Sequence, residues 1–223
     1  MSRVLFVLTS HGVLGEDGGP TGFHLGEAAL PWRILTMDGH EVDFASPLGG
    51  RPPMIAANLA ERDHALFLTD SVVAGKLERS LAPDQVDAGR YSAVYFVGGH
   101  GAMWDFRRNR YLKAVTRSIY EAGGVVAAIC HGQAALVDVT LSDGTYLVAG
   151  KHLTAFSQES EQARGLANVV PFALQSALEG RGAHFSCAPD RVAYVKVTDR
   201  LVTGQNPASA GELGDRMAVL LAG

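Results

Sequence analysis

The sequence has few cysteines, a nearly balanced charge and no long apolar run. Its two cysteines, Cys130 and Cys187, are too few for the disulfide framework of a small secreted domain, which favours an intracellular protein with reduced thiols. The net charge at pH 7 is −4, and the one basic group, Arg107, Arg108 and Arg110, is short enough to be an exposed helix start. A nucleic-acid partner is therefore not expected.

Apolar runs are short throughout the 223 residues. None approaches the ~20 residues of a transmembrane helix, so no membrane partner is expected. The first run, residues 4–8, is followed by polar residues and a glycine without a small-residue cleavage site, which is typical of a first strand rather than a signal peptide. We therefore expect a cytoplasmic protein with one domain, since this length is short for two.

Strand-like and helix-like segments alternate along the chain, which predicts an α/β fold with a doubly wound, mainly parallel sheet and helices on both faces. The expected strands are residues 4–8, 40–46, 91–99, 125–129, 151–157 and 191–204, and the expected helices are residues 25–39, 111–124 and 207–223. Pro31 would lie in the first turn of its helix, where proline is tolerated. Residues 50–90 are longer than a simple crossover needs, so we expect an elaboration beside the site.

One segment, VVAAICHGQAAL at residues 125–136, joins a buried-strand pattern to reactive side chains. Ligands of doubly wound sheets bind beyond the carboxyl ends of the strands, which is where Cys130 falls. The positive end of the following helix would lower the pKa of its thiol. The backbone N–H of His131, with one from Gly98 or Gly99, would form an oxyanion hole. The alternative is a structural cysteine, because free cysteines are commonly buried and inert.

Six segments in order carry a resemblance to a known family: TGFHLGEAALPW, DFASPLGGRPP, FVGGHGAMWDF, AAICHGQAAL, LTAFSQESE and LVTGQNPASA. Together they resemble the DJ-1/PfpI superfamily. Within it they are most similar to the Hsp31-like branch, which includes glutathione-independent glyoxalases and shares its fold with class I glutamine amidotransferase-like domains. The resemblance covers residue 4 to about residue 210. It implies a flavodoxin-like fold and a single DJ-1/PfpI-like domain over residues 1–223.

The resemblance also implies the catalytic residues. Cys130 matches the family's nucleophile at a strand-to-helix elbow, and His131 matches the histidine beside it. Glu27 matches the glutamate that approaches the thiol from the first helix. There, burial would raise its pKa and let it move a proton, whereas its alternative place is a polar helix edge. Glu161 matches the acid that completes a Cys-His-Glu triad, although Glu159 could serve instead.

The surroundings of the nucleophile follow from the same matches. Gly99 and His131 would supply the oxyanion-hole N–H groups, and His24, His100 and Trp104 would line the pocket. The segment GGHGAM lacks the spacing of a dinucleotide fingerprint, so no nucleotide cofactor is expected.

No metal is predicted either. His24 and Glu27 have a ligand-like i, i+3 spacing, with His64 as a third candidate, but such spacing is common. Cys187 belongs to no motif and is expected to be a partly buried bystander.

The leading hypothesis is a cofactor-independent glyoxalase that converts methylglyoxal, a small 2-oxoaldehyde, and water to lactate. Cys130 would form a hemithioacetal, and Glu27 would move a proton. The same residues would suit an amide hydrolase of the peptidase or amidotransferase-like kind. A stress chaperone (holdase) needs a large exposed apolar patch, which the sequence does not show, and a redox sensor would use oxidation of Cys130. Relatives often form homodimers, but no stretch identifies an interface.

Overall fold

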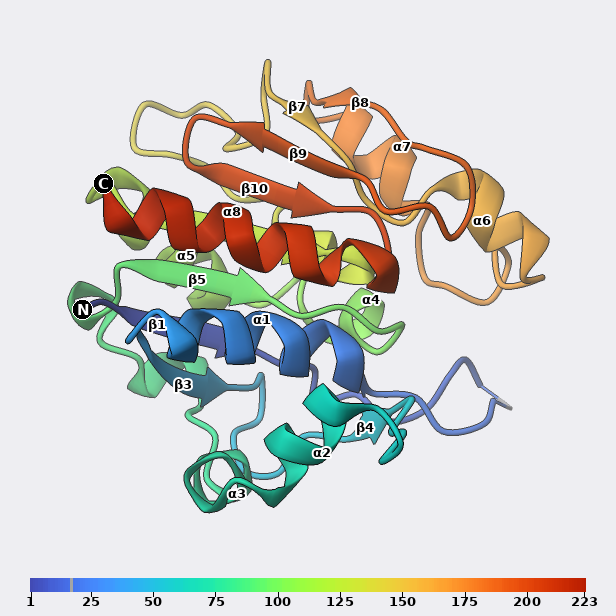
Figure 1. Ribbon diagram of the computed structural model, residues 1–223. Coiled ribbons are helices and arrows are strands. Elements are labelled where there is room, and N and C mark those ends of the chain that lie inside the picture. The colour runs from blue at the N-terminus through green and yellow to red at the C-terminus, as the bar shows by residue number, and fades with distance from the viewer. Residues whose placement is uncertain (17) are drawn as a thin grey trace.

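The computed structural model describes residues 1–16 and 18–223. Its main sheet has six strands in the order β3-β1-β5-β6-β10-β9 (Figure 1). The bounds are β1 Arg3–Val7, β3 Glu41–Ala45, β5 Ala93–Phe96, β6 Val125–Ile129, β9 Val195–Thr198 and β10 Leu201–Gly204. All neighbours pair in parallel except β9, which is antiparallel to β10. The predicted doubly wound, mainly parallel sheet is confirmed.

Helices cover both faces of this sheet, each over its own apolar core. Helices α1 (Leu25–Met37) and α8 (Ala210–Ala222) lie together in front of the sheet in Figure 1. Helix α5 (Arg110–Glu121) lies behind it, and its face of Leu112, Val115 and Ile119 is buried as its 3.6-residue period predicts. Fully buried strands such as β6 separate the two cores, which explains their nearly continuous apolar sequences.

Pro31 lies inside α1 and not in its first turn, so that expectation was wrong. A proline has no N–H to donate to the carbonyl four residues earlier, which belongs to Glu27. The hydroxyl of Tyr95, on β5, donates a 2.7 Å hydrogen bond to that carbonyl oxygen. The sheet thus supplies the hydrogen-bond donor that the helix lacks. The bond fixes α1 against β5 at Glu27.

The expected elaboration, residues 50–90, contains β4 (Met54–Ile55), α2 (Arg62–Thr69), α3 (Ser71–Glu78) and two short 3₁₀ helices, Pro83–Gln85 and Ala88–Arg90. It packs on α1 through an edge-to-face contact of Trp32 with Phe67, 5.3 Å between ring centroids. Strand β4 pairs with β2 (Phe23–His24), directly before α1. The insertion therefore adjoins the chain segment that leads into Glu27.

Residues 151–157 do not join the main sheet, which corrects a second expectation. Only β7 (His152–Leu153) is a strand, and it pairs with β8 (His184–Phe185) in a separate small sheet. The strand position beside β10 is taken by β9, so the backbone groups that follow β7 form their hydrogen bonds outside the main sheet. The N–H of Phe156 donates to the carbonyl of Cys130 at 3.2 Å. This contact brings the segment before α6 (Gln158–Ala163) to the end of β6.

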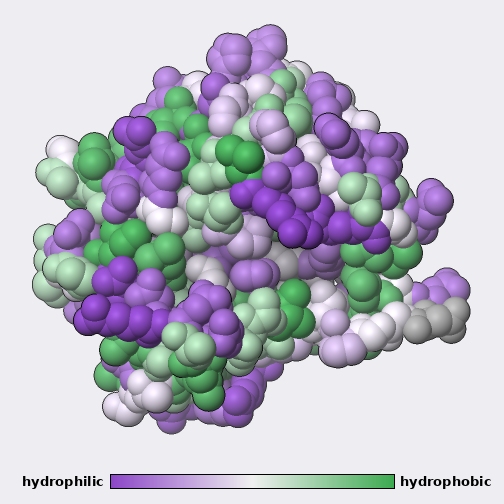
Figure 2. All heavy atoms as spheres, turned by 45° about the vertical axis from the view of Figure 1, so that its right-hand side comes forward, coloured by the Kyte–Doolittle hydropathy of each residue, from purple (hydrophilic) through white to green (hydrophobic). Residues whose placement is uncertain are grey.

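The surface carries no extended apolar face in the view of Figure 2, where green apolar side chains are interspersed with purple polar ones. Among the helices of residues 1–16 and 18–223, none has both the length and the apolar character required to cross a bilayer.

Candidate active site

Cys130 stands at a sharp turn between β6 and the 3₁₀ helix η3 (Cys130–Ala135). Its φ of +57° lies in the left-handed region, which costs a non-glycine residue on the order of 1–3 kcal/mol. The turn also needs Gly132, because a Cβ there would overlap the carbonyl oxygen of Phe96. Cys130 is 5% exposed, so its sulfur lies just beneath the surface at the carboxyl end of the sheet.

His131 links this thiol to Glu161. Its Nδ1 lies 3.3 Å from Sγ of Cys130, and its Nε2 lies 2.6 Å from Oε2 of Glu161. An ionised carboxylate only accepts hydrogen bonds, so the ring proton must be on Nε2. The lone pair of Nδ1 then faces the sulfur. The alternative partner, Glu159, is exposed and stands outside this contact.

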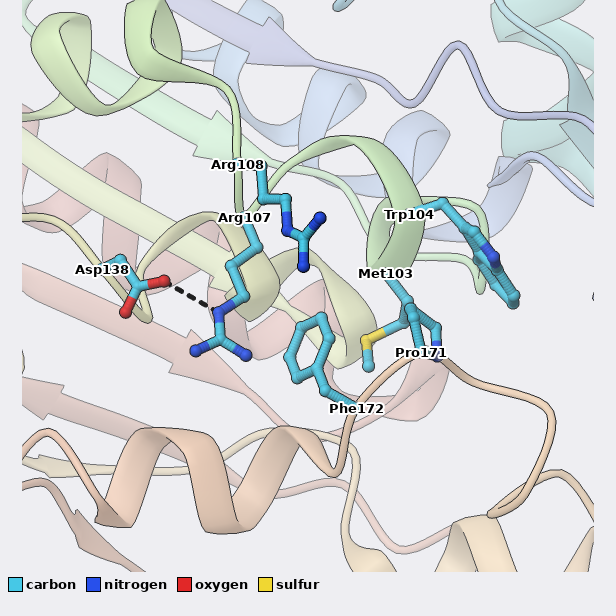
Figure 3. A pocket seen from close by; sticks show the side chains of 7 residues that line it. All are labelled: Met103, Trp104, Arg107, Arg108, Asp138, Pro171 and Phe172. Carbon is cyan, nitrogen blue, oxygen red and sulfur yellow. Dashed lines mark hydrogen bonds and ion pairs between the residues drawn. The ribbon is translucent and has the colours of Figure 1, made fainter.

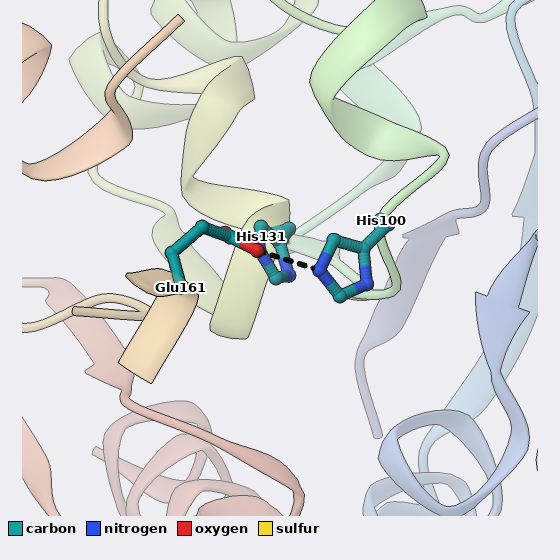
Figure 4. Close-up of side chains that lie close together, drawn as sticks. All are labelled: His100, His131 and Glu161. Atoms are coloured by element: carbon teal, nitrogen blue, oxygen red, sulfur yellow. Dashed lines mark hydrogen bonds and ion pairs between the residues drawn. The ribbon is translucent and has the colours of Figure 1, made fainter. Parts of the chain in front are cut away.

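A second histidine shares the same carboxylate. Nε2 of His100 lies 2.9 Å from Oε1 of Glu161, so each oxygen receives one imidazole N–H (Figure 4). The two rings also lie against each other, with centroids 4.0 Å apart. His100 was predicted only to line the pocket. Its position after strand β5 was readable from the sequence, but its contact with Glu161 depends on the fold of residues 151–163.

The protonation states follow from these contacts. Burial alone would raise the pKa of Glu161, but the hydrogen bonds from His100 and His131 lower it to about 2. Burial, with the neighbouring His100, lowers the pKa of His131 to about 4, against the opposing effect of Glu161. At neutral pH the carboxylate is therefore ionised and His131 is neutral, which is the state that a general base requires.

Glu27 approaches the thiol from helix α1 and is fully buried, not on a polar helix edge. Within residues 1–16 and 18–223, neither carboxyl oxygen makes a hydrogen bond of ordinary geometry, although the Cys130 thiol and the Gly98 N–H lie close. A Cβ at Gly98 would overlap Oε2 of Glu27 and lie 2.7 Å from Cβ of Cys130, so only glycine fits between them. Burial raises the pKa of Glu27 to about 8, against the effect of these two neighbours. The carboxyl is therefore mainly protonated at neutral pH.

The thiol itself differs from its prediction. Burial raises the pKa of Cys130 well above its usual range, and the charge of Glu27 raises it further. The backbone N–H of His131 acts in the opposite direction but is the weaker effect. The expected lowering by the helix end was therefore wrong, because a single 3₁₀ segment does not offset full desolvation. A nearby base must take the thiol proton when a substrate arrives.

The structure supports the two backbone N–H groups predicted for the oxyanion hole to different degrees. The N–H of His131 points toward the sulfur of Cys130. Gly99 has a φ of +112°, and a Cβ there would overlap the carbonyl oxygen of Gly22. This tight approach explains why the position is glycine. The oxyanion role of Gly99 stays a prediction.

His24 lies beside the site in β2, and its pocket role stays a prediction. Burial, together with His64, lowers the pKa of its imidazole to about 4, and its Nδ1 is buried without a partner among the described residues. Both rings lie against Gly26, where a Cβ would be 3.0 Å from Nε2 of His64.

Trp104, on α4 (Ala102–Asp105), stacks on His11 with ring centroids 4.9 Å apart. It lines a cavity of about 400 Å³ together with Met103, Arg107, Arg108, Asp138, Pro171 and Phe172 (Figure 3). Cys130 is not among these lining residues, so this hollow is separate from the thiol.

The remaining cysteine, Cys187, is exposed and not partly buried as expected, and both thiols are free.

The sequence interpretation missed Gln133, which organises the site from below. Its amide nitrogen lies 2.9–3.1 Å from the carbonyl oxygens of Ala128, Thr154 and Gly204, which share its two N–H donors. Ala128 lies near the end of β6, Thr154 lies in the segment before α6, and Gly204 is the last residue of β10. A polar residue in an otherwise small, apolar segment was the available signal, because a buried amide must find partners.

The structure is that of an α/β protein with a nucleophilic cysteine. Its cysteine stands at an elbow after a parallel strand, beside a histidine–glutamate pair and a second, buried glutamate. Residues 20–218 match the model of the DJ-1/PfpI family, and the chain belongs to that family. It is 32% identical to a glutathione-independent glyoxalase of Saccharomyces cerevisiae over 220 residues, 93% of each chain. It is 29% identical to glyoxalase 3 of Candida albicans, over 94% of each.

A solved structure, the Rapid Encystment Protein 24 KDa of Francisella tularensis, superposes with a TM-score of 0.94 at 35% identity, covering 99% of both chains. The predicted family, its glyoxalase-containing branch and the flavodoxin-like fold are thereby confirmed.

Proposed function

We propose that this chain is a glutathione-independent glyoxalase that converts a small 2-oxoaldehyde, methylglyoxal in the simplest case, and water to the 2-hydroxy acid. The observation that carries the proposal is the placement of Cys130 between two different proton carriers. The neutral His131 offers a lone pair 3.3 Å from the sulfur, and the buried Glu27 holds a proton at neutral pH. Full-length similarity to curated glyoxalases supports the same reaction.

The first step is attack on the aldehyde. Nδ1 of His131 takes the thiol proton as the sulfur bonds to the aldehyde carbon, and the imidazolium is stabilised by Glu161. The product is a hemithioacetal, whose oxygen is held by backbone N–H groups of the elbow. Because the thiol pKa is raised, thiolate forms during this attack and not before it.

The second step moves hydrogen between neighbouring carbons. The carboxyl of Glu27 first gives its proton to the oxygen of the hemithioacetal; the resulting carboxylate then removes the proton from the former aldehyde carbon and returns it to the former ketone carbon, through an enediol. Glu27 suits this task because its raised pKa, about 8, lies near working pH. One carbon is oxidised and its neighbour reduced, so no external oxidant is needed. The resulting thioester is hydrolysed by water, which releases the 2-hydroxy acid and the thiol.

The burial of Cys130 limits the substrate. With only 5% of the residue exposed, a short aldehyde can reach the sulfur more easily than a peptide chain. The reaction needs a reduced thiol, which supports a cytoplasmic location.

The test is lactate formation from methylglyoxal without glutathione. We expect turnover by the wild type, loss of turnover in Cys130→Ala and Glu27→Gln, and unchanged turnover in the matched control Cys187→Ser. Absence of turnover in wild-type protein whose Cys130 is titratable with a thiol reagent would overturn the proposal. Turnover retained in Glu27→Gln would remove the proton-transfer role of that residue.

Amide hydrolysis is the second candidate, because the hydrogen bonds from Cys130 through His131 to Glu161 are also those of a cysteine hydrolase. That reaction does not need the proton transfer assigned to Glu27. Release of ammonia or amine from amide substrates, retained in Glu27→Gln and lost in Cys130→Ala, would favour it.

A further inference from the structure

Three potential metal ligands converge beside the thiol. A ring nitrogen of His100, a ring nitrogen of His131 and a carboxylate oxygen of Glu161 all lie within 4.8 Å of one another. They come from three separate segments, namely the turn after β5, the turn after β6, and α6 (Figure 4). The side chains of His131 and Glu161 are 1% and 7% exposed, whereas that of His100 is 18% exposed. His100 therefore forms the solvent side of the cluster.

The proposed reaction does not account for this second histidine. Orienting His131 requires one carboxylate oxygen, and a single Nε2–H bond from His131 satisfies that need. The other oxygen of Glu161 faces a second imidazole at 2.9 Å. Two imidazole nitrogens and one carboxylate oxygen are the protein ligands of a known type of zinc site, in which the ligands carry a single negative charge.

Binding an ion would require the three side chains to shift by about an ångström. Ligand atoms around a tetrahedral zinc ion at about 2.0–2.1 Å are separated by about 3.3 Å. The two hydrogen-bonded pairs, at 2.6 and 2.9 Å, would have to separate by about 0.7 and 0.4 Å, and ligand atoms as far as 4.8 Å apart would have to approach by up to about 1.5 Å. Sγ of Cys130 contacts Nδ1 of His131, on the ring edge away from Nε2, so the sulfur lies outside this ligand set.

We propose that His100, His131 and Glu161 bind one Zn²⁺ ion and that the bound ion switches the active site off. The inhibition rests on the proposed function, whereas the binding does not. Each histidine would coordinate through Nε2, where it now carries a proton. That proton has to move to Nδ1 of the same ring, so no net proton is released. In His131, the new Nδ1–H would face Sγ of Cys130, and the lone pair that accepts the thiol proton would be lost.

Binding is measured first, on the full chain freed of metal with a chelator. Calorimetric titration with Zn²⁺ should give one site per chain in the wild type. Affinity should fall by about 100-fold or more in His100→Gln, because even the loss of outer-shell partners costs about 10–100-fold. The controls His152→Gln and Glu159→Gln, both at exposed positions, should bind as the wild type does. Unaltered circular dichroism would show that each variant is folded.

The identity of the ligands is tested separately. Cys130→Ala should keep its affinity for zinc, and the Co²⁺-substituted wild type should lack a sulfur-to-cobalt charge-transfer band. In ¹⁵N-histidine spectra of the wild type, zinc should change Nε2 of two histidines and place a proton on their Nδ1. This measurement needs no substitution, so it does not depend on the folding of a variant.

Inhibition is the last readout. Methylglyoxal turnover should fall in proportion to zinc occupancy and return when a chelator is added. Equal zinc affinity in wild type and His100→Gln, or loss of binding in Cys130→Ala, would overturn the proposed site. Zinc binding with undiminished turnover would overturn the switch. If the wild type has no turnover at all, the glyoxalase proposal fails, while the binding experiments still decide the metal site.

Discussion

The 2.6 Å contact between Nε2 of His131 and a carboxylate oxygen of Glu161 decides which ring nitrogen faces the thiol. Since the carboxylate holds the proton of His131 on Nε2, Nδ1 remains free to accept the proton of Cys130. Glu161 therefore controls the reactivity of a sulfur to which it is not hydrogen-bonded. It is a positioning residue, and its effect should be visible separately from substrate binding.

Glu161→Gln should lower kcat by roughly 10²–10⁴-fold with little change in KM. A glutamine puts an NH2 donor in place of one of the two oxygens, so one of the imidazole N–H groups of His100 and His131 loses its acceptor, and the tautomer of His131 is no longer fixed. Steady-state kinetics with methylglyoxal measure this effect. The matched control is Glu159→Gln, two residues away and exposed, which should behave as the wild type does. Equal losses in the two variants would contradict the role of Glu161.

Glu27→Gln should become progressively more stable than the wild type as pH rises. The carboxyl of Glu27 has a pKa of about 8 in the folded protein and an ordinary value of 4.5, so between these values only the unfolded chain loses the proton. Stability contributed by this group therefore falls with rising pH. The difference between variant and wild type should grow by about 5 kcal/mol between pH 4 and pH 9, a change that glutamine cannot show.

Urea denaturation at several pH values measures that difference, with Glu159→Gln as the exposed control. The part of the difference that is the same at every pH reflects altered packing. A difference that does not change with pH would mean that the folded pKa of Glu27 is not raised.

Cys130 should react slowly with iodoacetamide at neutral pH and steadily faster above pH 9. Burial and the charge of Glu27 raise the pKa of its thiol, so little thiolate is present at pH 7. The experiment is done in a Cys187→Ser background, because Cys187 is exposed and would react first. Adding Glu27→Gln removes one cause of the raised pKa and should speed alkylation. Each unit of pKa decrease gives about ten times more thiolate. An alkylation rate that no longer rises with pH above pH 7 would show that the thiol pKa is lowered instead.

Gly99→Ala should lower the free energy of unfolding by about 2–5 kcal/mol, because it combines backbone strain with a steric overlap. The φ at Gly99 is +112°, and the added Cβ would overlap the carbonyl oxygen of Gly22. Gly144→Ala is the matched control, since Gly144 has a φ of +86° but no heavy atom of the described residues lies within 4 Å of an added Cβ. It should cost only about 1–2 kcal/mol from strain. Equal costs in urea denaturation would show that Gly22 moves away.

Local patterns predicted those parts of the fold that depend on local rules. The strand at residues 125–129 agrees with β6, because an apolar run bounded by Gly124 and Cys130 has clear ends. Pro31 was misplaced because its tolerance within α1 depends on the hydroxyl of Tyr95, 64 residues away in sequence. A long-range hydrogen bond of that kind leaves no local signal.

The candidate site shows the same division. Family resemblance placed Cys130, Glu27 and Glu161, and the structure brings them to one end of the sheet. The direction of the thiol pKa was mispredicted because burial depends on packing from several elements, whereas a helix end is visible locally. The shared carboxylate between His100 and His131 also needed coordinates, since it depends on how residues 151–157 leave the sheet.

The amide of Gln133 bears on how the site opens and closes in solution. It joins the end of β6, the segment before α6 and the end of β10 through three carbonyls. Hydrogen exchange in these segments should therefore require a shared, large-scale opening rather than independent fraying. The nucleophile and its acid partner would be lost and regained in one cooperative event.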